Sequence, residues 1–291
     1  MKALLDNPNV RIRDVHAVGE KIEKLIADGK DNLMVISDFD YTMTRFSDEN
    51  GKLFSNTHLI FDHDLEKTDP AEYAKIKAYN EKYLSIECSP NLSHEEKAPH
   101  MIKWFKRVHQ NVIDRQLSER QVEQIVKSST MVLRENVDTF LKVLNVEEIP
   151  MVLFSAGNAT VIEIFLQNSL SNVHVVSNRL GFDENGICNR FLEPFIHCYS
   201  KNGSSLSPED PYFHDYGTRQ NVILIGDSIG DLQMHKGVDR NGVLLKIGFF
   251  NHDEEDETLL KKYLEGYDIL VCGDLCFSVP LEIISQVVEK C

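Results

Sequence analysis

The sequence lacks any run of about 18 apolar residues, the length that a helix needs to cross a membrane. Its first eight residues are too short and polar a stretch for a secretory signal peptide. Basic residues are also scarce, because 31 Lys and Arg stand against 46 Asp and Glu, a formal net charge of −15. Binding nucleic acid or an anionic membrane nonspecifically needs a wide basic face. We therefore expect a cytoplasmic protein whose partners are neither nucleic-acid polymers nor membranes.

The six cysteines show neither paired C-x-x-C knuckles nor a compact disulfide pattern. Free thiols are the expected state of cysteine in the cytoplasm. Cys272 and Cys276 alone are a weak indication of zinc, and the eleven histidines include no H-E-x-x-H or similar spacing. These histidines are therefore expected at surface or core positions and not as zinc ligands.

The 291 residues, 42% of them hydrophobic, can form one large core and a smaller module. Helical periodicity predicts a helix over residues 15–27, with Gly29 as its stop. Apolar runs alternate with helical stretches in the βα rhythm of a doubly wound parallel sheet. The region from about 46 to 143 instead has long amphipathic segments, which predict a helical cap. We expect an α/β core formed by residues 1–46 and 144–291, and a cap formed by residues 47–143. The predicted strands are 33–37, 151–155, 173–176, 222–225, 243–247 and 269–271.

The stretch D-F-D-Y-T places Asp38 and Asp40 at the end of a predicted buried strand. A carboxylate can attack phosphorus and carry the phosphoryl group covalently, so Asp38 is the candidate nucleophile. Asp40 has the position of a general acid and base, which protonates the leaving oxygen and then deprotonates water. The alternative is an Asx turn that closes the strand, because Asp and Thr are ordinary turn formers.

Three further segments follow in order. One apolar run ends in Ser155, Lys201 lies well downstream, and another apolar run leads into G-D-S-I-G-D, which contains Asp227 and Asp231. Together with D-F-D-Y-T, these segments resemble the four motifs of the haloacid dehalogenase superfamily of phosphotransferases. Dehalogenases lack an acid at the position of Asp40, and the ion-pumping ATPases resemble D-K-T-G-T there. The resemblance therefore implies a phosphatase.

A phosphate monoester brings two negative charges toward a carboxylate, so the site needs cations, which Mg²⁺ and Lys201 can supply. Mg²⁺ prefers oxygen ligands and keeps several waters. The expected ligands are the Asp38 carboxylate, the backbone carbonyl of Asp40 and the Asp227 carboxylate. Asp231 would bind or orient that shell.

Ser155, Ala156 and Lys201 are the expected phosphate-binding residues. Ser155 would donate a hydrogen bond to a phosphate oxygen, and a helix beginning near Asn158 would offer free N–H groups. Seen in isolation, Ser155 would more often be a helix N-cap and Lys201 a solvated surface residue. Their shared setting favours the site, because open parallel sheets bind ligands at the carboxyl ends of their strands.

The cap sequence Y-L-S-I-E-C-S-P at 83–90, followed by P-H-M-I-K-W-F at 99–105, resembles the type III cytosolic 5′-nucleotidases, the pyrimidine-nucleotidase group. The resemblance extends over nearly the whole chain. In that group a cap Glu binds the nucleotide, and Glu87 matches its I-E-x-x-P setting. Tyr83 and Trp104 could stack on a base, or they could pack the cap, because Trp104 also lies on an expected buried stripe.

One difference from the pyrimidine-preferring members leaves the preferred base undecided. Pyrimidine-preferring members resemble K-S-H where this chain has Arg107, Val108 and His109. A sister branch acts on 7-methylguanosine monophosphate, whose positive ring would suit aromatic side chains and Glu87.

The resemblance implies a monomeric, Mg²⁺-dependent 5′-nucleotidase that hydrolyses CMP, UMP or 7-methyl-GMP through an aspartyl-phosphate. The alternatives are a phosphatase for another small ester, such as phosphoserine, and a silent scaffold protein. A scaffold would be expected to have lost one of the motif residues, and none is lost. Transfer of the phosphoryl group to a nucleoside in place of water stays open.

Overall fold

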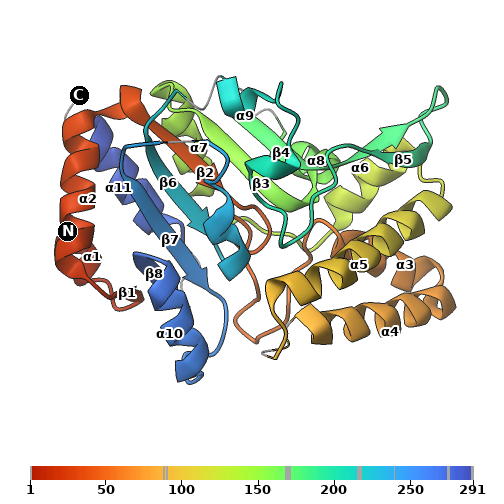
Figure 1. The fold of residues 1–291 in the computed structure, drawn as a ribbon. Coiled ribbons are helices and arrows are strands. Elements are labelled where there is room, and N and C mark those ends of the chain that lie inside the picture. The colour runs from red at the N-terminus through yellow and green to blue at the C-terminus, as the bar shows by residue number, and fades with distance from the viewer. Residues whose placement is uncertain are drawn as a thin grey trace.

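The computed structural model describes residues 2–87, 89, 91–167, 172–214, 218–238, 240–273 and 276–289. Its centre is an eight-stranded sheet with the order β1-β8-β7-β6-β2-β3-β4-β5 (Figure 1). Neighbouring strands from β8 to β4 pair in parallel, and the edge strands β1 and β5 pair antiparallel. The strands are β1 Val10–Ile12, β2 Leu33–Ser37, β3 Met151–Asn158, β4 Val173–Phe182, β5 Cys188–Leu192, β6 Asn221–Gly226, β7 Leu244–Phe250 and β8 Ile269–Cys272.

Helices cover both faces of the sheet, as the predicted doubly wound fold requires. The α-helices are α1 Lys2–Leu5, α2 Val15–Asp28, α3 Leu59–Thr68, α4 Pro70–Glu87, α5 His94–Asp114, α6 Glu119–Ser128, α7 Val137–Val146, α8 Ala159–Leu166, α9 Pro211–His214, α10 Glu257–Gly266 and α11 Ser278–Val288. The described residues also form the 3₁₀ helices η1 Lys30–Asn32, η2 Gly203–Ser205 and η3 Ile229–Gln233. None of the helices in the described ranges combines the length and the apolar character that crossing a bilayer requires.

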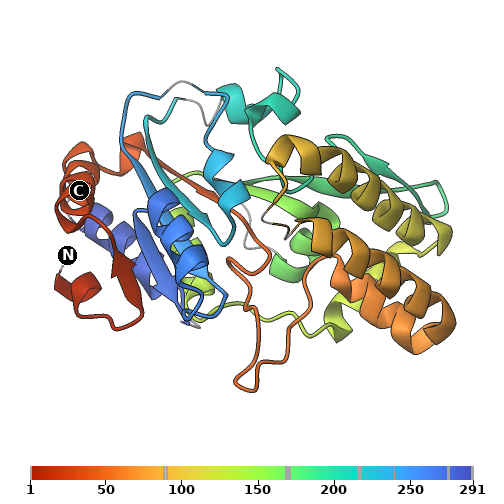
Figure 2. The same ribbon diagram turned by 60° about the horizontal axis from the view of Figure 1, so that its bottom comes forward.

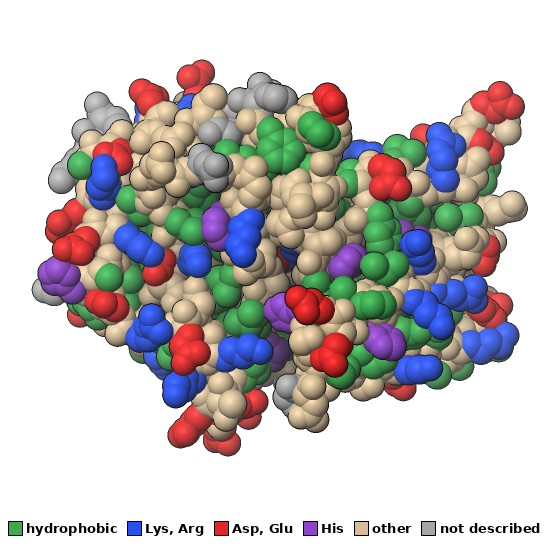
Figure 3. Space-filling model, in the orientation of Figure 1, with side chains coloured by type: hydrophobic (Ala, Val, Ile, Leu, Met, Phe, Trp, Pro, Cys, Tyr) green, Lys and Arg blue, Asp and Glu red, His purple; other side chains and the backbone are tan. Residues whose placement is uncertain are grey.

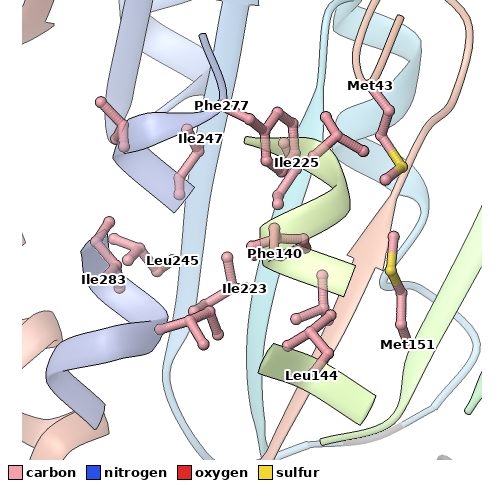
Figure 4. Close-up of a cluster of buried hydrophobic side chains, with 14 of the residues drawn as sticks. Met43, Phe140, Leu144, Met151, Ile223, Ile225, Leu245, Ile247, Phe277 and Ile283 are labelled. Carbon is pink, nitrogen blue, oxygen red and sulfur yellow. The ribbon is translucent and has the colours of Figure 1, made fainter. Parts of the chain in front are cut away.

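The central strand β2 contributes to two separate apolar layers. Leu33 and Val35 belong to a cluster with side chains of α2, α7 and α11, part of which Figure 4 shows. Met34 and Ile36 point to the other face and join side chains of α9 and α10. Successive side chains of a strand face opposite ways, so a strand buried on both faces is apolar throughout. This explains why continuous apolar runs predicted the parallel strands.

In the structure, the stretch predicted as a helical cap, residues 47–143, begins with the four helices α3, α4, α5 and α6. These helices lie beside α8 and β5, at the end of the molecule away from the chain termini (Figures 1 and 2). Their apolar cluster includes Phe61, Val112 and Val122, and it continues into the core through Val161 and Leu180. The cap is therefore packed on the core, with shared apolar side chains.

Helix α7 includes the predicted boundary at residue 143, but its buried side chains face the core. Val137, Phe140, Leu141 and Leu144 all lie in the apolar cluster of the sheet. Figure 4 shows Phe140 and Leu144 there. We propose that the cap ends before α7 and that the whole helix belongs to the core. The amphipathic pattern of α7 resembles that of the cap helices, so the sequence alone did not separate them.

Candidate active site

Three parallel strands bring the predicted motif residues to one edge of the sheet. β2 lies between β3 and β6, with Ser37 in register with Leu153 and with Ile225. Asp38 directly follows β2, Ser155 lies in the last part of β3, and Asp227 directly follows β6. Because parallel strands end at a common edge, these side chains converge although they are far apart in the chain.

Lys201 joins two of the predicted acids. Its Nζ donates to Asp38 Oδ1 at 2.6 Å and to Asp231 Oδ1 at 2.7 Å, and all three residues are buried. Burial alone would lower the pKa of the Lys201 ammonium, but Asp231 and Asp38 outweigh it and raise the pKa. The ammonium therefore stays charged, and Lys201 is not a solvated surface residue.

The Asp38 carboxylate has a second donor, Thr42 Oγ1, at 3.1 Å from its Oδ2. Burial raises the pKa of Asp38 to about 7, although the Lys201 ammonium opposes the shift. A cation bound at the site would lower this pKa again and keep the ionised form that a nucleophile requires.

A possible metal site is formed by Asp38, Asp227 and Asp231, each of which offers an oxygen within 4.8 Å of the others. Burial raises the pKa of Asp227 well above its usual range, and the nearby Asp231 and Asp38 carboxylates add to the rise. Three carboxylates with one ammonium leave an excess of negative charge. Oxygen donors with this charge suit a hard divalent cation, so the residues fit the predicted ligand set.

Asp231 has protein donors on both of its oxygens. Oδ1 accepts from Lys201, and Oδ2 accepts from the backbone N–H of Asp227 at 3.1 Å, the N–H of Ser228 at 2.9 Å and the Ser228 hydroxyl at 2.9 Å. This carboxylate fixes the start of η3 and the position of Lys201.

Asp40 is held by Thr57, a residue of the linker into the cap. The Thr57 N–H donates to Asp40 Oδ1 at 2.9 Å, and the Thr57 hydroxyl donates to Oδ2 at 2.5 Å. The Asn158 N–H in turn donates to the Thr57 hydroxyl at 3.1 Å. Burial raises the pKa of Asp40, while the two bonds from Thr57 oppose the shift. The sequence does not predict the role of Thr57, because no motif in the linker includes it.

The backbone after Ser155 is tightly enclosed. A Cβ atom on Gly157 would lie 2.2 Å from Thr57 Oγ1 and 2.6 Å from Asp40 Oδ2, so only glycine fits there. Ser155 is 1% exposed, and its Oγ accepts from the Gly157 N–H at 2.9 Å. The N-cap of α8 is Asn158, whose side chain accepts from Val161 N, so the N-cap alternative for Ser155 is wrong.

The Ala156 carbonyl accepts hydrogen bonds from both the cap and the core. It accepts from His58 Nε2, at the N-terminus of α3, at 3.1 Å, and from Asn178 Nδ2 at 2.9 Å. Cap and core therefore meet at the predicted phosphate-binding segment.

Glu87, the last residue of α4, faces the core segment that contains Lys201. Its carboxylate lies near enough to the Cys198 thiol and to the Lys97 and Lys201 ammonium groups to interact with them. Burial raises the pKa of Glu87, and these neighbours oppose the shift. The structure thus places the predicted base-binding acid near Lys201, one of the predicted phosphate-binding residues.

The two predicted stacking residues are placed differently. Tyr83 is 3% exposed, and its ring stacks on Trp104 with 6.1 Å between centroids and 20° between planes. Trp104 is partly exposed, and its Nε1 donates to Asn80 Oδ1 at 2.9 Å. Tyr83 therefore packs inside the cap, and Trp104 has the outer position of the pair.

The core, its four convergent motifs and the helical cap define a phosphatase of the haloacid dehalogenase class. Comparison with known sequences is more specific. The family model described as "Pyrimidine 5'-nucleotidase (UMPH-1)" matches residues 41–288, and the chain belongs to this family. The predicted family and the predicted hydrolase activity of a 5′-nucleotidase are confirmed.

Relatives that are named as 5′-nucleotidases, and a solved structure of one, agree with this family. The chain is 39% identical over 288 residues to "Putative cytosolic 5'-nucleotidase 3" of Caenorhabditis elegans. The aligned region covers 98% of this chain and 77% of the relative. It is 35% identical over 268 residues to the human "7-methylguanosine phosphate-specific 5'-nucleotidase". That aligned region covers 91% of this chain and 88% of the relative. The structure of cytosolic 5′-nucleotidase IIIB bound to cytidine matches with a TM-score of 0.88 and 30% identity, covering 99% of this chain and 97% of that one.

A phosphoserine phosphatase bound to its substrate matches with a TM-score of 0.54 and 16% identity, covering 86% of this chain and 96% of that one. At this identity the likeness shows the fold alone.

Proposed function

We propose that the chain hydrolyses nucleoside 5′-monophosphates to nucleoside and phosphate, with Mg²⁺ as its cofactor and Asp38 as its nucleophile. The observation that carries the proposal is the buried Lys201 ammonium, bonded to Asp38 and Asp231 beside Asp227. This arrangement provides a carboxylate nucleophile, a fixed cation and metal-binding oxygens at one point.

The reaction would proceed in two displacements. An Asp38 oxygen attacks phosphorus, the bond from phosphorus to ribose O5′ breaks, and Asp40 gives its proton to the departing oxygen. Asp40 then takes a proton from water, whose oxygen attacks the aspartyl-phosphate and releases phosphate and the Asp38 carboxylate. Burial raises the pKa of Asp40, which supports the protonated form that the first displacement needs. Ser155 and Lys201 would hold the phosphoryl oxygens.

Mg²⁺ would supply positive charge that offsets the charge of the phosphate. We propose that Asp38, Asp227 and the backbone carbonyl of Asp40 hold the ion. The four donors on Asp231 support an orienting role for this residue.

We propose that the cap recognises the base through Glu87 and Trp104, with Tyr83 supporting the Trp104 ring from inside. The relatives are named for 7-methylguanosine phosphate, and the solved relative holds cytidine, so both bases are candidates. Glu87 can accept from the amine of cytosine or from the ring N–H and amine of guanine. A cationic 7-methylguanine would in addition be attracted by the Glu87 charge and by the Trp104 ring.

The test is phosphate release from CMP, UMP, GMP, AMP, 7-methyl-GMP and phosphoserine, each with Mg²⁺ and with EDTA. We expect Mg²⁺-dependent release from CMP, UMP or 7-methyl-GMP, and the best substrate names the base. Release from phosphoserine alone would refute the proposed cap function.

The Asp38→Asn variant should lose turnover and keep its circular-dichroism spectrum, because the change removes only the nucleophilic charge. Retained turnover would refute the mechanism.

A cytoplasmic location and a monomeric state belong to the same proposal. The name of the C. elegans relative includes the word cytosolic. Acidic and basic side chains are mixed on the face of the molecule in Figure 3. Light scattering after size exclusion tests the second point, and a mass near the 33.3 kDa of one chain is expected.

A further inference from the structure

Arg134 lies in the segment between α6 and α7, and its side chain contacts the turn that follows Asp38. The residue is 4% exposed. Its Nε donates to the Thr42 carbonyl at 2.9 Å, and its Nη2 donates to the Tyr41 carbonyl at 3.0 Å and to Asn251 Oδ1 at 2.7 Å. The guanidinium also stacks 4.2 Å from the centroid of the Phe249 ring. One buried cation thus binds the first motif and the residue that follows β7.

The turn that Arg134 binds has an unusual backbone. Tyr41 has φ of 64°, a left-handed conformation that costs a residue with a Cβ about 1 kcal/mol or more. Its carbonyl accepts from Arg134 and also from Asn251 Nδ2 at 2.9 Å. This turn brings the Thr42 hydroxyl to Asp38. Hydrogen bonds from two distant residues therefore stabilise the backbone that orients the nucleophile.

Asn251 connects the same network to the metal-binding acids. Its Nδ2 donates to Asp227 Oδ2 at 3.2 Å, and its Oδ1 accepts from Arg134. A guanidinium has only donors, so the Asn251 oxygen must face Arg134 and the amide N–H groups must face Asp227. A reversed amide would place an oxygen against the Asp227 carboxylate. Arg134 thereby fixes which side of the amide meets the acid.

We infer that Arg134 and Asn251 are positioning residues that hold Asp38 and Asp227 in the arrangement needed to bind a divalent cation. The inference rests on the metal site of the proposed function. Neither residue touches the reacting atoms. Arg134 acts through the turn at Tyr41 and through the Asn251 amide, and Asn251 acts on the Asp227 carboxylate.

A lysine cannot replace Arg134 in this role. The three acceptors are reached from Nε and Nη2 of one rigid, planar group whose face lies on an aromatic ring. A lysine ammonium is a compact point charge without that planar fork. The Arg134→Lys variant therefore keeps the charge and loses the geometry.

The test uses Mn²⁺ as the probe, with free Mn²⁺ measured by electron paramagnetic resonance. We expect Arg134→Lys and Asn251→Leu each to weaken Mn²⁺ binding about 10- to 100-fold, the usual effect of removing a residue that orients a metal ligand. The Mg²⁺ concentration for half-maximal activity should rise by a similar factor. The double variant should lose less than the product of the two single effects, because both act on the Asp227 carboxylate.

Arg115→Lys is the matched control. Arg115 also donates to a backbone carbonyl and a carboxylate, those of Phe61 and Asp64, but it lies in the cap. Its replacement should leave Mn²⁺ affinity unchanged. Melting temperatures separate a loss of folding from a loss of metal affinity in each variant.

Unchanged Mn²⁺ affinity in both site variants, with or without a lower melting temperature, would overturn the positioning role. A wild-type chain that binds Mn²⁺ but hydrolyses no nucleotide would refute the proposed function and leave the positioning role testable by the same variants. A wild-type chain that binds no Mn²⁺ would overturn both.

Discussion

Glu87 is one of the cap residues that contact the core, and it is the proposed binding partner of the base. Its backbone carbonyl accepts from Lys97 Nζ at 2.7 Å and from the Tyr199 hydroxyl at 3.4 Å. The carboxylate lies near the Cys198 thiol. Tyr199 and Cys198 lie two and three residues before Lys201, so one short core segment serves both the cap and the nucleophile. One nucleotide could therefore contact the Glu87 carboxylate with its base and the Lys201 segment with its phosphate.

The proposed role of Glu87 predicts different losses for two substrates. Glu87→Gln keeps the shape and one acceptor oxygen but removes the charge. Hydrogen bonds to charged groups contribute about 1.5–3 kcal/mol, so kcat/KM for 7-methyl-GMP should fall about 10- to 100-fold. The loss for CMP should be smaller, because neutral cytosine still finds an acceptor. Steady-state kinetics with both nucleotides measure the difference.

Equal losses for the two nucleotides would contradict charge recognition by Glu87. Glu95→Gln is the matched control, because Glu95 is an exposed acid in the first turn of α5. It should leave both kcat/KM values unchanged.

Helix α5 carries an aromatic surface that packs on the core around His109. The His109 ring stacks on Phe191 with 3.7 Å between centroids and 2° between planes, and it lies 6.0 Å from the ring of His58. His109 is 6% exposed, and its Nε2 has no hydrogen-bond partner among the described residues. Burial lowers the pKa of His109 to about 3, and His58 adds to the shift. The imidazole is therefore neutral at any pH at which the enzyme would work.

This packing predicts a pH dependence of stability. The unfolded chain takes a proton on His109 near pH 6.5, the folded chain only near pH 3, so the unfolded state binds more protons between these values. Stability is therefore lost as the pH falls through this window. His109→Phe keeps a stacked ring without a proton site. Between pH 7.5 and pH 5 it should lose about 2 kcal/mol less free energy of unfolding than the wild type.

Urea denaturation of both proteins at the two pH values measures the effect. Comparing the change with pH, rather than the absolute stability, removes any cost of fitting a phenylalanine ring. Equal losses in the two proteins would show that His109 does not carry the pH dependence.

Among the elements, the buried parallel strands could be predicted from the sequence and the edges could not. β2 and β6 are buried along their whole length, so their apolar runs are continuous. β1 has three half-buried residues, and β5 is mostly exposed, so neither has such a run. The predicted domain boundary at residue 143 falls inside α7, because the core-facing stripe of this helix looks like that of a cap helix.

The site follows the same physical rule. Residues at strand ends could be predicted, because strand pairing brings those ends together. Thr57, Arg134 and Asn251 could not, since each reaches its partner from a loop. Arg134 and Asn251 are 117 positions apart and meet only through the folded chain. No local pattern marks a contact of this kind.

At the scale of the whole molecule, the charge of the active site opposes folding. The chain has a formal net charge of −15, and three carboxylates with one ammonium are gathered at its centre. A divalent cation that binds only the folded chain offsets this repulsion. At 100 times its Kd, such a ligand stabilises the folded state by about 2.7 kcal/mol. The proposed Mg²⁺ site is therefore expected to contribute to stability as well as to chemistry.

Thermal unfolding with Mg²⁺ and with EDTA tests this expectation. The wild type should melt several degrees higher with Mg²⁺, since about 1 kcal/mol moves Tm by roughly 2–4 °C for a chain of this size. Asp227→Asn should melt higher than the wild type in EDTA, because it removes a carboxylate whose pKa burial raises, and it should lose the response to Mg²⁺. Asp62→Asn is the matched control: burial raises the pKa of this cap residue to about 6, so the variant should also be stabilised in EDTA but should keep the full Mg²⁺ response. A full Mg²⁺ response in Asp227→Asn would place the ion elsewhere.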